Sequence, residues 1–179
     1  MLQLTIMTIA GAIMIFFICL WAVSSLVALI RGRGVPYVPL TRDKLDFVNE
    51  KIKLNADDRV VDLGCGEGKV LRMFEKQGVI DLTGYEINYW AFLIAKIKNK
   101  FHKSKVKVYF KNFNKVDLSQ YNVIFCYLLP CVITSLKEKF DRELKPGSRV
   151  ISYAFEAKDW RTPDVLSDEK GRKIFIYKM

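Results

Sequence analysis

A glycine-rich segment that follows an apolar run limits the fold of this chain more than any other feature. Residues 60–69 read VVDLGCGEGK, with Asp62 near the end of the run and glycines at positions 64, 66 and 68. Glycine allows positive φ angles and lets a ligand approach the backbone closely. A buried strand that ends in such a loop and continues into a helix is typical of a ligand-binding α/β sheet. The segment therefore predicts a ligand at the carboxyl end of the first strand.

The rest of the chain alternates strands with helices, as a doubly wound α/β sheet does. Apolar runs predict strands at residues 59–64, 79–87, 106–110, 122–128, 149–155 and 174–178. Helical spacing predicts helices at residues 69–77, 88–99 and 132–144, and another after an N-cap at Thr41. The run NVIFCYL is nearly all apolar, as expected of a central strand in a buried parallel sheet.

The spacing of the glycines separates three classes of ligand. Counted from Gly64, both the P-loop pattern and the dinucleotide fingerprint require a glycine at position 69, which is lysine. Asp62 would repel a pyrophosphate, whereas it would attract the cationic methionine end of S-adenosylmethionine. Glu86, 20 residues after Gly66 at the end of the second predicted strand, can accept both ribose hydroxyls. The loop therefore predicts S-adenosylmethionine, the cofactor of methyltransferases, as its ligand.

The first 30 residues carry no charged side chain and are predicted to span a membrane. The 25 residues from Ile6 to Ile30 are apolar apart from three hydroxyl residues. In a helix they would rise about 37 Å, which exceeds a hydrocarbon core of about 30 Å. Signal peptides have a basic n-region and a shorter apolar stretch. Arg31 and Arg33 follow directly, so the positive-inside rule places the remaining chain on the cytoplasmic side or its matrix equivalent. We expect a transmembrane anchor at 1–30, a linker at 31–40 and a methyltransferase domain at 41–179.

All charged residues lie after residue 30, and they give the chain a net charge of +10. Residues 96–115 contain eight lysines and no acidic residue, interleaved with four aromatic side chains. Such a stretch suits an anionic membrane surface, a nucleic-acid backbone or a solvated protein surface. The four cysteines include no C-x-x-C pair, and His102 is the only histidine. The sequence therefore predicts reduced structural cysteines and no metal site.

Several motifs together resemble one family over almost the whole chain. They are the apolar N-terminus, the linker PYVP, and the segments VVDLGCGEGKVL, GYEINYWAFLIAK, NVIFCYLLP and RVISYAFEAKDWRTPD. This pattern resembles the membrane-anchored protein-lysine methyltransferases that act on the ATP synthase c-subunit and on the adenine nucleotide translocase, together with their prokaryotic relatives. The resemblance implies a Rossmann-like class I methyltransferase fold, S-adenosylmethionine as cofactor, and a lysine of a small integral membrane protein as substrate.

The resemblance also implies roles for single residues. The cofactor would be held by Asp62, Gly64, Cys65, Gly66, Gly68, Glu86, Ile87 and Asn112. The methyl-transfer site would be lined by Tyr127, Leu128 and Pro130. The linker residues Tyr37 and Pro39 and the loop residue Trp160 would serve the substrate. Two positions depart from the family pattern: Asn112 stands where an acid is more usual, and Tyr89 where relatives often have proline.

Methylation of an amine needs a neutral acceptor, which an apolar slot favours. We see no nucleophile–base arrangement, so the sequence predicts no covalent intermediate and no dedicated base. A nucleic-acid methyltransferase using Lys96–Lys115 stays an alternative, although CYLLP lacks the Asp/Asn-Pro-Pro-aromatic strand end of base-methylating enzymes. A quinone or lipid methyltransferase is a second alternative, and a membrane adaptor without activity is a third. The oligomeric state is not predicted.

Overall fold

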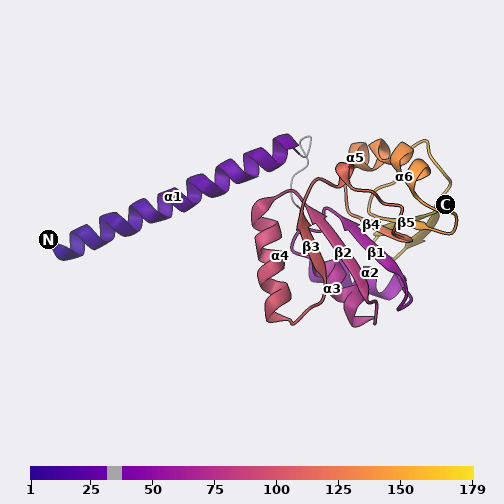
Figure 1. Cartoon of the computed structure of the whole chain (residues 1–179), viewed down its shortest axis with the longest axis horizontal. Helices are drawn as coiled ribbons and strands as arrows, with labels where there is room; N and C mark the ends of the chain where they lie inside the picture. Colours follow the sequence, from indigo (N-terminus) through magenta and orange to yellow (C-terminus); the bar gives the residue numbers. More distant parts are fainter. Residues whose placement is uncertain (32–37) are drawn as a thin grey trace.

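The computed structural model describes residues 1–31 and 38–179. It consists of one long N-terminal helix, α1 (Leu2–Arg31), and an α/β domain from which this helix extends (Figure 1). Tyr37, which the sequence placed in a substrate or linker role, lies outside the described residues. Pro39 is described and is exposed.

The domain is built on one mixed sheet of seven strands in the order β3-β2-β1-β4-β5-β7-β6. Five strands run parallel to one another: β1 (Arg59–Leu63), β2 (Asp81–Glu86), β3 (Lys107–Phe110), β4 (Val123–Cys126) and β5 (Arg149–Tyr153). β7 (Lys173–Lys178) is antiparallel to β5 and to β6 (Asp164–Ser167). The strand order reverses between β1 and β4, and ligands of open α/β sheets bind at the carboxyl ends of strands at such a point. The predicted doubly wound sheet is confirmed.

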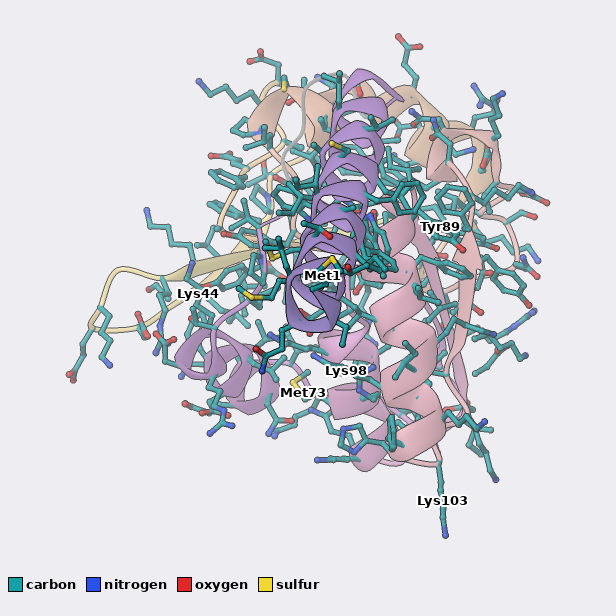
Figure 2. The ribbon with its side chains drawn as sticks, turned by 90° about the vertical axis from the view of Figure 1, so that its left-hand side faces the viewer. Met1, Lys44, Met73, Tyr89, Lys98 and Lys103 are labelled. Atoms are coloured by element: carbon teal, nitrogen blue, oxygen red, sulfur yellow. The ribbon has the colours of Figure 1, made fainter. Side chains whose placement is uncertain are left out.

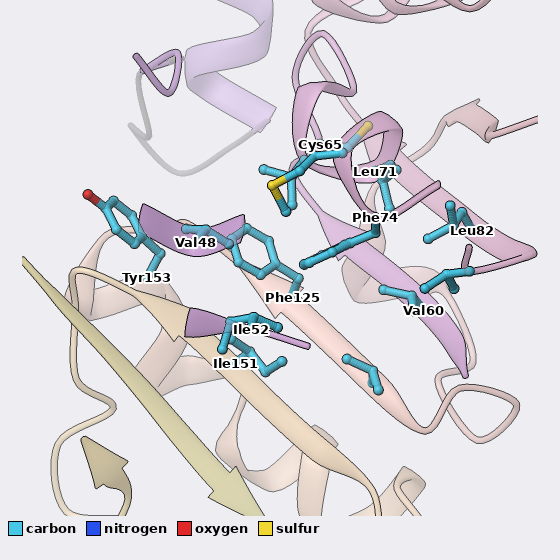
Figure 3. Close-up of a cluster of buried hydrophobic side chains, with 14 of the residues drawn as sticks. Val48, Ile52, Val60, Cys65, Leu71, Phe74, Leu82, Phe125, Ile151 and Tyr153 are labelled. Atoms are coloured by element: carbon cyan, nitrogen blue, oxygen red, sulfur yellow. The ribbon is translucent and has the colours of Figure 1, made fainter. Parts of the chain in front are cut away.

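Helices cover both faces of the sheet. One face carries α2 (Arg42–Lys51), α3 (Lys69–Lys76) and α4 (Tyr89–Phe101), which contribute buried side chains to a single cluster. The other face carries α5 (Pro130–Ser135) and α6 (Lys137–Glu143), with a short 3-10 helix η1 (Phe113–Lys115) beside them. Figure 3 shows the first cluster, where Phe74 and Phe125 meet edge to face with ring centroids 5.9 Å apart. This packing fixes α3, and with it the glycine loop, against the centre of the sheet.

The structure differs from the sequence predictions in two element boundaries, one additional strand and one detail of a helix cap. The predicted helix at 132–144 is two helices, because the Leu136 N–H bonds to the Ile133 carbonyl in a tighter turn between α5 and α6. The strand predicted to reach residue 128 ends at Cys126. β6 was not predicted, because its residues are mostly exposed and show no apolar alternation. Thr41 does occupy the N-cap position of α2, but its hydroxyl donates to the Asp43 carboxylate and caps no backbone N–H.

α1 contains a candidate membrane span. Gln3–Val23, 21 residues with a mean hydropathy of 2.5, is long and apolar enough to cross a bilayer, and none of it is buried in the structure. At 1.5 Å per residue such a segment rises about 31 Å, close to the thickness of a hydrocarbon core. The sidedness expected from Arg31 and Arg33 stays a prediction.

Candidate active site

The glycine loop between β1 and α3 has a backbone that few other residues could adopt. Gly64, Gly66 and Gly68 have φ angles of +82°, +53° and +73°. A Cβ atom on Gly64 would also lie 3.3 Å from the Leu128 side chain, so a larger residue would be both strained and crowded. The loop folds back on β2, because the Gly64 and Cys65 N–H groups both donate to the Tyr85 carbonyl, at 2.9 and 3.1 Å.

Glu86 ties this loop to the end of β2. Its carboxylate accepts the Gly66 N–H at 2.8 Å on one oxygen, and the Ile87 and Asn88 N–H groups at 2.8 and 2.7 Å on the other. The side chain is only 6% exposed, and burial raises its pKa while the three backbone N–H groups oppose this rise. The structure therefore brings together Gly66, Glu86 and Ile87, as the sequence predicted.

Asp62 places a second buried acid beside the glycine loop. Asp62 is 3% exposed. Within the described part of the chain, the Asp62 carboxylate accepts no hydrogen bond and forms no ion pair. Burial, and then the negative charge of Glu86, raise the pKa of Asp62 well above its ordinary value. Burial and the two acids also raise the pKa of the Cys65 thiol, so this thiol stays protonated. A cation beside Asp62 would compensate for the buried carboxylate, which is what a ligand with a sulfonium and an ammonium offers.

Neighbouring helices hold the loop from outside. The Arg72 guanidinium donates to the Glu67 carbonyl and to Asn99 Oδ1, both at 2.8 Å. The Glu67 carboxylate forms an ion pair with Lys98 of α4. These supports were not predicted, because their spacing along the chain carries no motif. The structure shows that Asn99 of this lysine-rich helix is buried, at 7% exposed, which the sequence does not indicate.

Asn112 lies at the same edge of the sheet as Glu86. The register pairs Phe110 of β3 with Glu86, and the Lys111 N–H donates to the Glu86 carbonyl at 3.0 Å. The Asn112 side chain caps η1 by accepting the Asn114 N–H at 2.9 Å. Asn112 is thus placed at the edge of the sheet that carries Glu86, and its contact with adenine stays a prediction.

The carboxyl ends of β4 and β5 form an aromatic wall. Tyr127, half-buried, packs edge to face on Tyr153 at 5.1 Å and stacks on Phe155 at 6.1 Å between ring centroids. Lys44 of α2 reaches over the same ring, with its Nζ atom 5.8 Å from the ring centroid. Leu128 is buried beside Gly64, whereas Pro130 is exposed at the first position of α5. The two wall residues from β5 and its loop, and Lys44, were not predicted.

Trp160 occupies a different environment from this wall. Its ring packs on Phe140 and Tyr177, with centroid distances of 5.6 and 4.8 Å, and its indole N–H donates to Asp141 at 3.0 Å. These contacts anchor the loop after β5 to α6 and to the cluster on that face of the sheet. A substrate role for Trp160 stays a prediction.

Among residues 1–31 and 38–179, no group of three or more His, Cys, Asp or Glu side chains is arranged to hold a metal ion.

Comparison with known proteins identifies the family of this chain. Residues 62–164 match the ANTKMT methyltransferase domain. The chain belongs to this family. A protein-lysine N-methyltransferase of Saccharolobus islandicus is 36% identical over 149 residues, which cover 80% of this chain and 92% of that protein. The human lysine N-methyltransferase named for the ATP synthase c-subunit is 29% identical over 146 residues, and the match covers 80% of this chain but only 61% of the human protein.

Solved structures agree with this assignment. The structure of an RNA methyltransferase from Salinibacter ruber in complex with S-adenosyl-L-homocysteine has a TM-score of 0.71 and 25% identity, covering 79% of this chain and 93% of that one. The ANTKMT-family chain is therefore an S-adenosylmethionine-dependent methyltransferase with the class I fold. The buried Asp62, the positive-φ loop and Glu86 fit this cofactor, which when bound supplies a methyl group on a positively charged sulfur.

The raised pKa of Asp62 predicts a pH-dependent stability of the cofactor-free protein. The folded protein keeps the Asp62 proton to higher pH than the unfolded chain, whose carboxyl has the ordinary pKa of 3.8. The folded state therefore binds more protons above this pH, and its stability falls as the pH rises toward the raised pKa. We expect the free energy of unfolding of the wild type to fall relative to that of Asp62→Asn as the pH rises above about 4, measured by urea denaturation over the range in which the protein stays folded. A constant difference across this range would show that Asp62 titrates normally.

Proposed function

We propose that this enzyme methylates the ε-amino group of a lysine in an integral membrane protein, close to the bilayer surface. The observation that carries the proposal is the position of Lys44, whose ammonium lies over the Tyr127 ring at the carboxyl end of β4. An aromatic wall that binds the ammonium group of Lys44 over a ring can bind the ammonium group of a substrate lysine by the same cation–π interaction. The protein-lysine activity of the relative from S. islandicus, by its name, supports the same substrate class.

The acceptor lysine must lose a proton before its nitrogen can react, since its ordinary pKa is about 10.4. The aromatic rings at the end of β4 and β5 would take water away from a side chain that enters beside them, and desolvation favours the neutral amine. The positive charge of Lys44 acts in the same direction, because a like charge disfavours the ammonium form. The Tyr127 ring opposes both effects by attracting a cation, so it would bind the ammonium before the proton passes to water.

Removing the charge of Lys44 should therefore shift the pH dependence of methylation. In Lys44→Gln we expect the rise of kcat with pH to occur at higher pH, because the acceptor lysine bound in the complex loses a positive neighbour. Lys44 is half-buried on α2 and lies outside the apolar clusters, so the melting temperature should change little. Lys44→Arg, which keeps the charge, is the matched control and should retain the wild-type profile. An unshifted profile for Lys44→Gln would remove Lys44 from the proton step.

The membrane part of the proposal is supported by α1. Its apolar segment is long enough to span a bilayer, and enzyme and substrate confined to one bilayer meet at a higher effective concentration. Arg31 and Arg33 favour an orientation in which the α/β domain lies on the cytoplasmic side of the membrane, or on the equivalent matrix side, where S-adenosylmethionine is available. Relatives named for the ATP synthase c-subunit and for the adenine nucleotide translocase also support an integral membrane protein as the substrate.

Labelling of native membranes with radioactive S-adenosylmethionine tests this proposal. Membranes are incubated with the purified full chain, and with an Asp62→Ala, Glu86→Ala variant as the control, and are then separated into protein, lipid and nucleic acid. We expect label in a small membrane-protein band with the wild type alone. Label in the lipid fraction would favour a quinone or lipid substrate. Label in RNA would favour the activity named for the Salinibacter relative.

A further inference from the structure

α4 exposes its larger apolar side chains to the surroundings and buries small ones, whereas an ordinary surface helix buries its larger apolar side chains. The inner face packs on the sheet through small or amide side chains, namely Ala91, Ala95 and Asn99, all buried. The outer face carries Ile94, Ile97 and Phe101, which are 38%, 47% and 82% exposed. Their spacing of three and four residues places these three side chains on one stripe of the helix. The helix thus presents a continuous apolar stripe to its surroundings.

Basic and aromatic side chains surround this stripe. On α4 and in the segment after it, Lys96, Lys100, Lys103 and Lys105 are exposed, and no acidic residue lies between residues 96 and 115. Tyr89 and Phe110 extend the apolar surface toward the edge strand β3, with ring centroids 5.6 Å apart. An exposed apolar stripe with a cationic border is the composition of helices that lie in the interface of an anionic bilayer.

The position of α1 indicates which partner this surface meets. α1 contacts α4, and in Figure 1 it leaves the domain on the side where α4 lies. Figure 2 views the protein from that side: α1 points toward the reader at Met1, while α4 runs lengthwise between the labels Tyr89 and Lys103. A bilayer crossed by α1 would therefore face α4 along its length.

We propose that α4 lies on the surface of the membrane that α1 crosses, with Ile94, Ile97 and Phe101 inserted between anionic lipid headgroups. We call this face of α4, with its bordering lysines, the α4 surface. This inference requires one part of the proposed function, namely that α1 spans the bilayer, and it does not depend on the identity of the methylated substrate. Single-stranded nucleic acid is the competing partner, but it stacks on aromatic rings. Two of the three stripe residues are isoleucines, which favours lipid.

Fluorescent labels at single thiols test the contact in the full chain. A Cys19→Ser, Cys131→Ser background keeps only the buried Cys65 and Cys126. Ile97→Cys places the label on the stripe, and Val165→Cys is the matched control, since Val165 is 49% exposed and lies in β6 at the opposite edge of the sheet. Cys19, labelled alone in Cys131→Ser, reports whether α1 is in lipid. Each protein is reconstituted in nanodiscs of phosphatidylcholine, with or without phosphatidylglycerol.

In anionic nanodiscs we expect spin-labelled lipid to quench the label at position 97 and iodide not to reach it. The label at position 165 should be reached by iodide in both lipids. If position 97 is as accessible to iodide as position 165 while Cys19 is quenched by lipid, the α4 contact is wrong and the spanning helix stands. If Cys19 is not quenched by lipid, the membrane anchor is wrong, and the label at position 97 still decides the α4 contact. Shielding of position 97 only after addition of single-stranded RNA would assign the surface to nucleic acid.

Charge reversal tests the lipid preference of the α4 surface. Lys96→Glu, Lys100→Glu, Lys103→Glu should reduce lipid quenching at position 97 in anionic nanodiscs by about half or more, since each lysine near an anionic surface contributes to attraction. Lys145→Glu, Lys158→Glu, Lys170→Glu carries the same net charge with its changes in exposed loops of the C-terminal half, and should leave the quenching unchanged. Equal losses in both triple variants would overturn a specific role for the α4 surface.

Discussion

Asp62→Asn is expected to weaken S-adenosylmethionine binding by about tenfold to a hundredfold and to stabilise the cofactor-free protein. The carboxylate is buried and has no partner within the described residues, so the free protein gains when its charge is removed. The cofactor loses an attractive charge beside its cationic end. Calorimetric titration measures the first effect, and the melting temperature without cofactor measures the second.

Glu86→Gln is the matched variant, and its effect on stability should have the opposite sign. The Glu86 carboxylate accepts hydrogen bonds from three backbone N–H groups through its two oxygens. A glutamine side chain has one oxygen and one NH₂ group, so at least one of these backbone N–H groups would face a donor and lose its hydrogen bond. A donor left unpaired in the core costs about 1–3 kcal/mol, so this variant should lose both stability and cofactor affinity. Equal effects of the two substitutions on the melting temperature would contradict the different roles assigned to the two acids.

Gly84→Ala should destabilise the domain by about 1–3 kcal/mol. It should also weaken cofactor binding, although we assign Gly84 no contact with the cofactor. Gly84 pairs with Asp62 across β1 and β2, and a Cβ atom there would lie 2.6 Å from Cys65 Sγ and 2.8 Å from Cys65 Cβ and from Leu71 Cδ1. Cys65 belongs to the glycine loop, so the loop itself must move. Urea denaturation and calorimetric titration measure the two losses.

A double-mutant cycle separates this crowding from a general effect of alanine in a strand. Cys65→Gly removes both the sulfur and the Cβ atom that the new methyl group would meet. We expect Gly84→Ala to cost less in the Cys65→Gly background than in the wild type, with a favourable coupling energy. If the two substitutions are additive, the close approach of β2 to the glycine loop does not explain the need for glycine at position 84.

The grouping of Asp62, the glycines and Glu86 could be predicted from sequence because these residues lie at the ends of strands. The loop after β1 fixes the positions of Asp62 and the glycines, and Glu86 ends the adjacent parallel strand. A parallel sheet brings such ends to one edge, so spacing along the chain is sufficient to assemble them.

The contact between Lys44 and the aromatic wall could not be predicted in the same way. Lys44 and Tyr127 are 83 positions apart in the sequence, and their contact depends on how α2 packs over the sheet. In the sequence, Trp160 is as good a candidate as Tyr127 for lining the substrate site, because both are aromatic residues that follow a predicted strand. In the structure, the Trp160 ring packs against Phe140 and Tyr177 instead. The strand β6 was missed because it lies at an exposed edge, where no buried face imposes an alternation of apolar residues.

Hydrolysis of the labelled membrane protein decides whether the enzyme methylates lysine next to a bilayer. The band labelled by the wild-type enzyme is isolated, hydrolysed to amino acids and separated against methylated lysine standards. We expect the label to elute as an ε-N-methylated lysine, from a peptide next to a membrane span of the substrate. Label that elutes with any other amino acid, or a lysine from a protein without a membrane span, would contradict the proposed function.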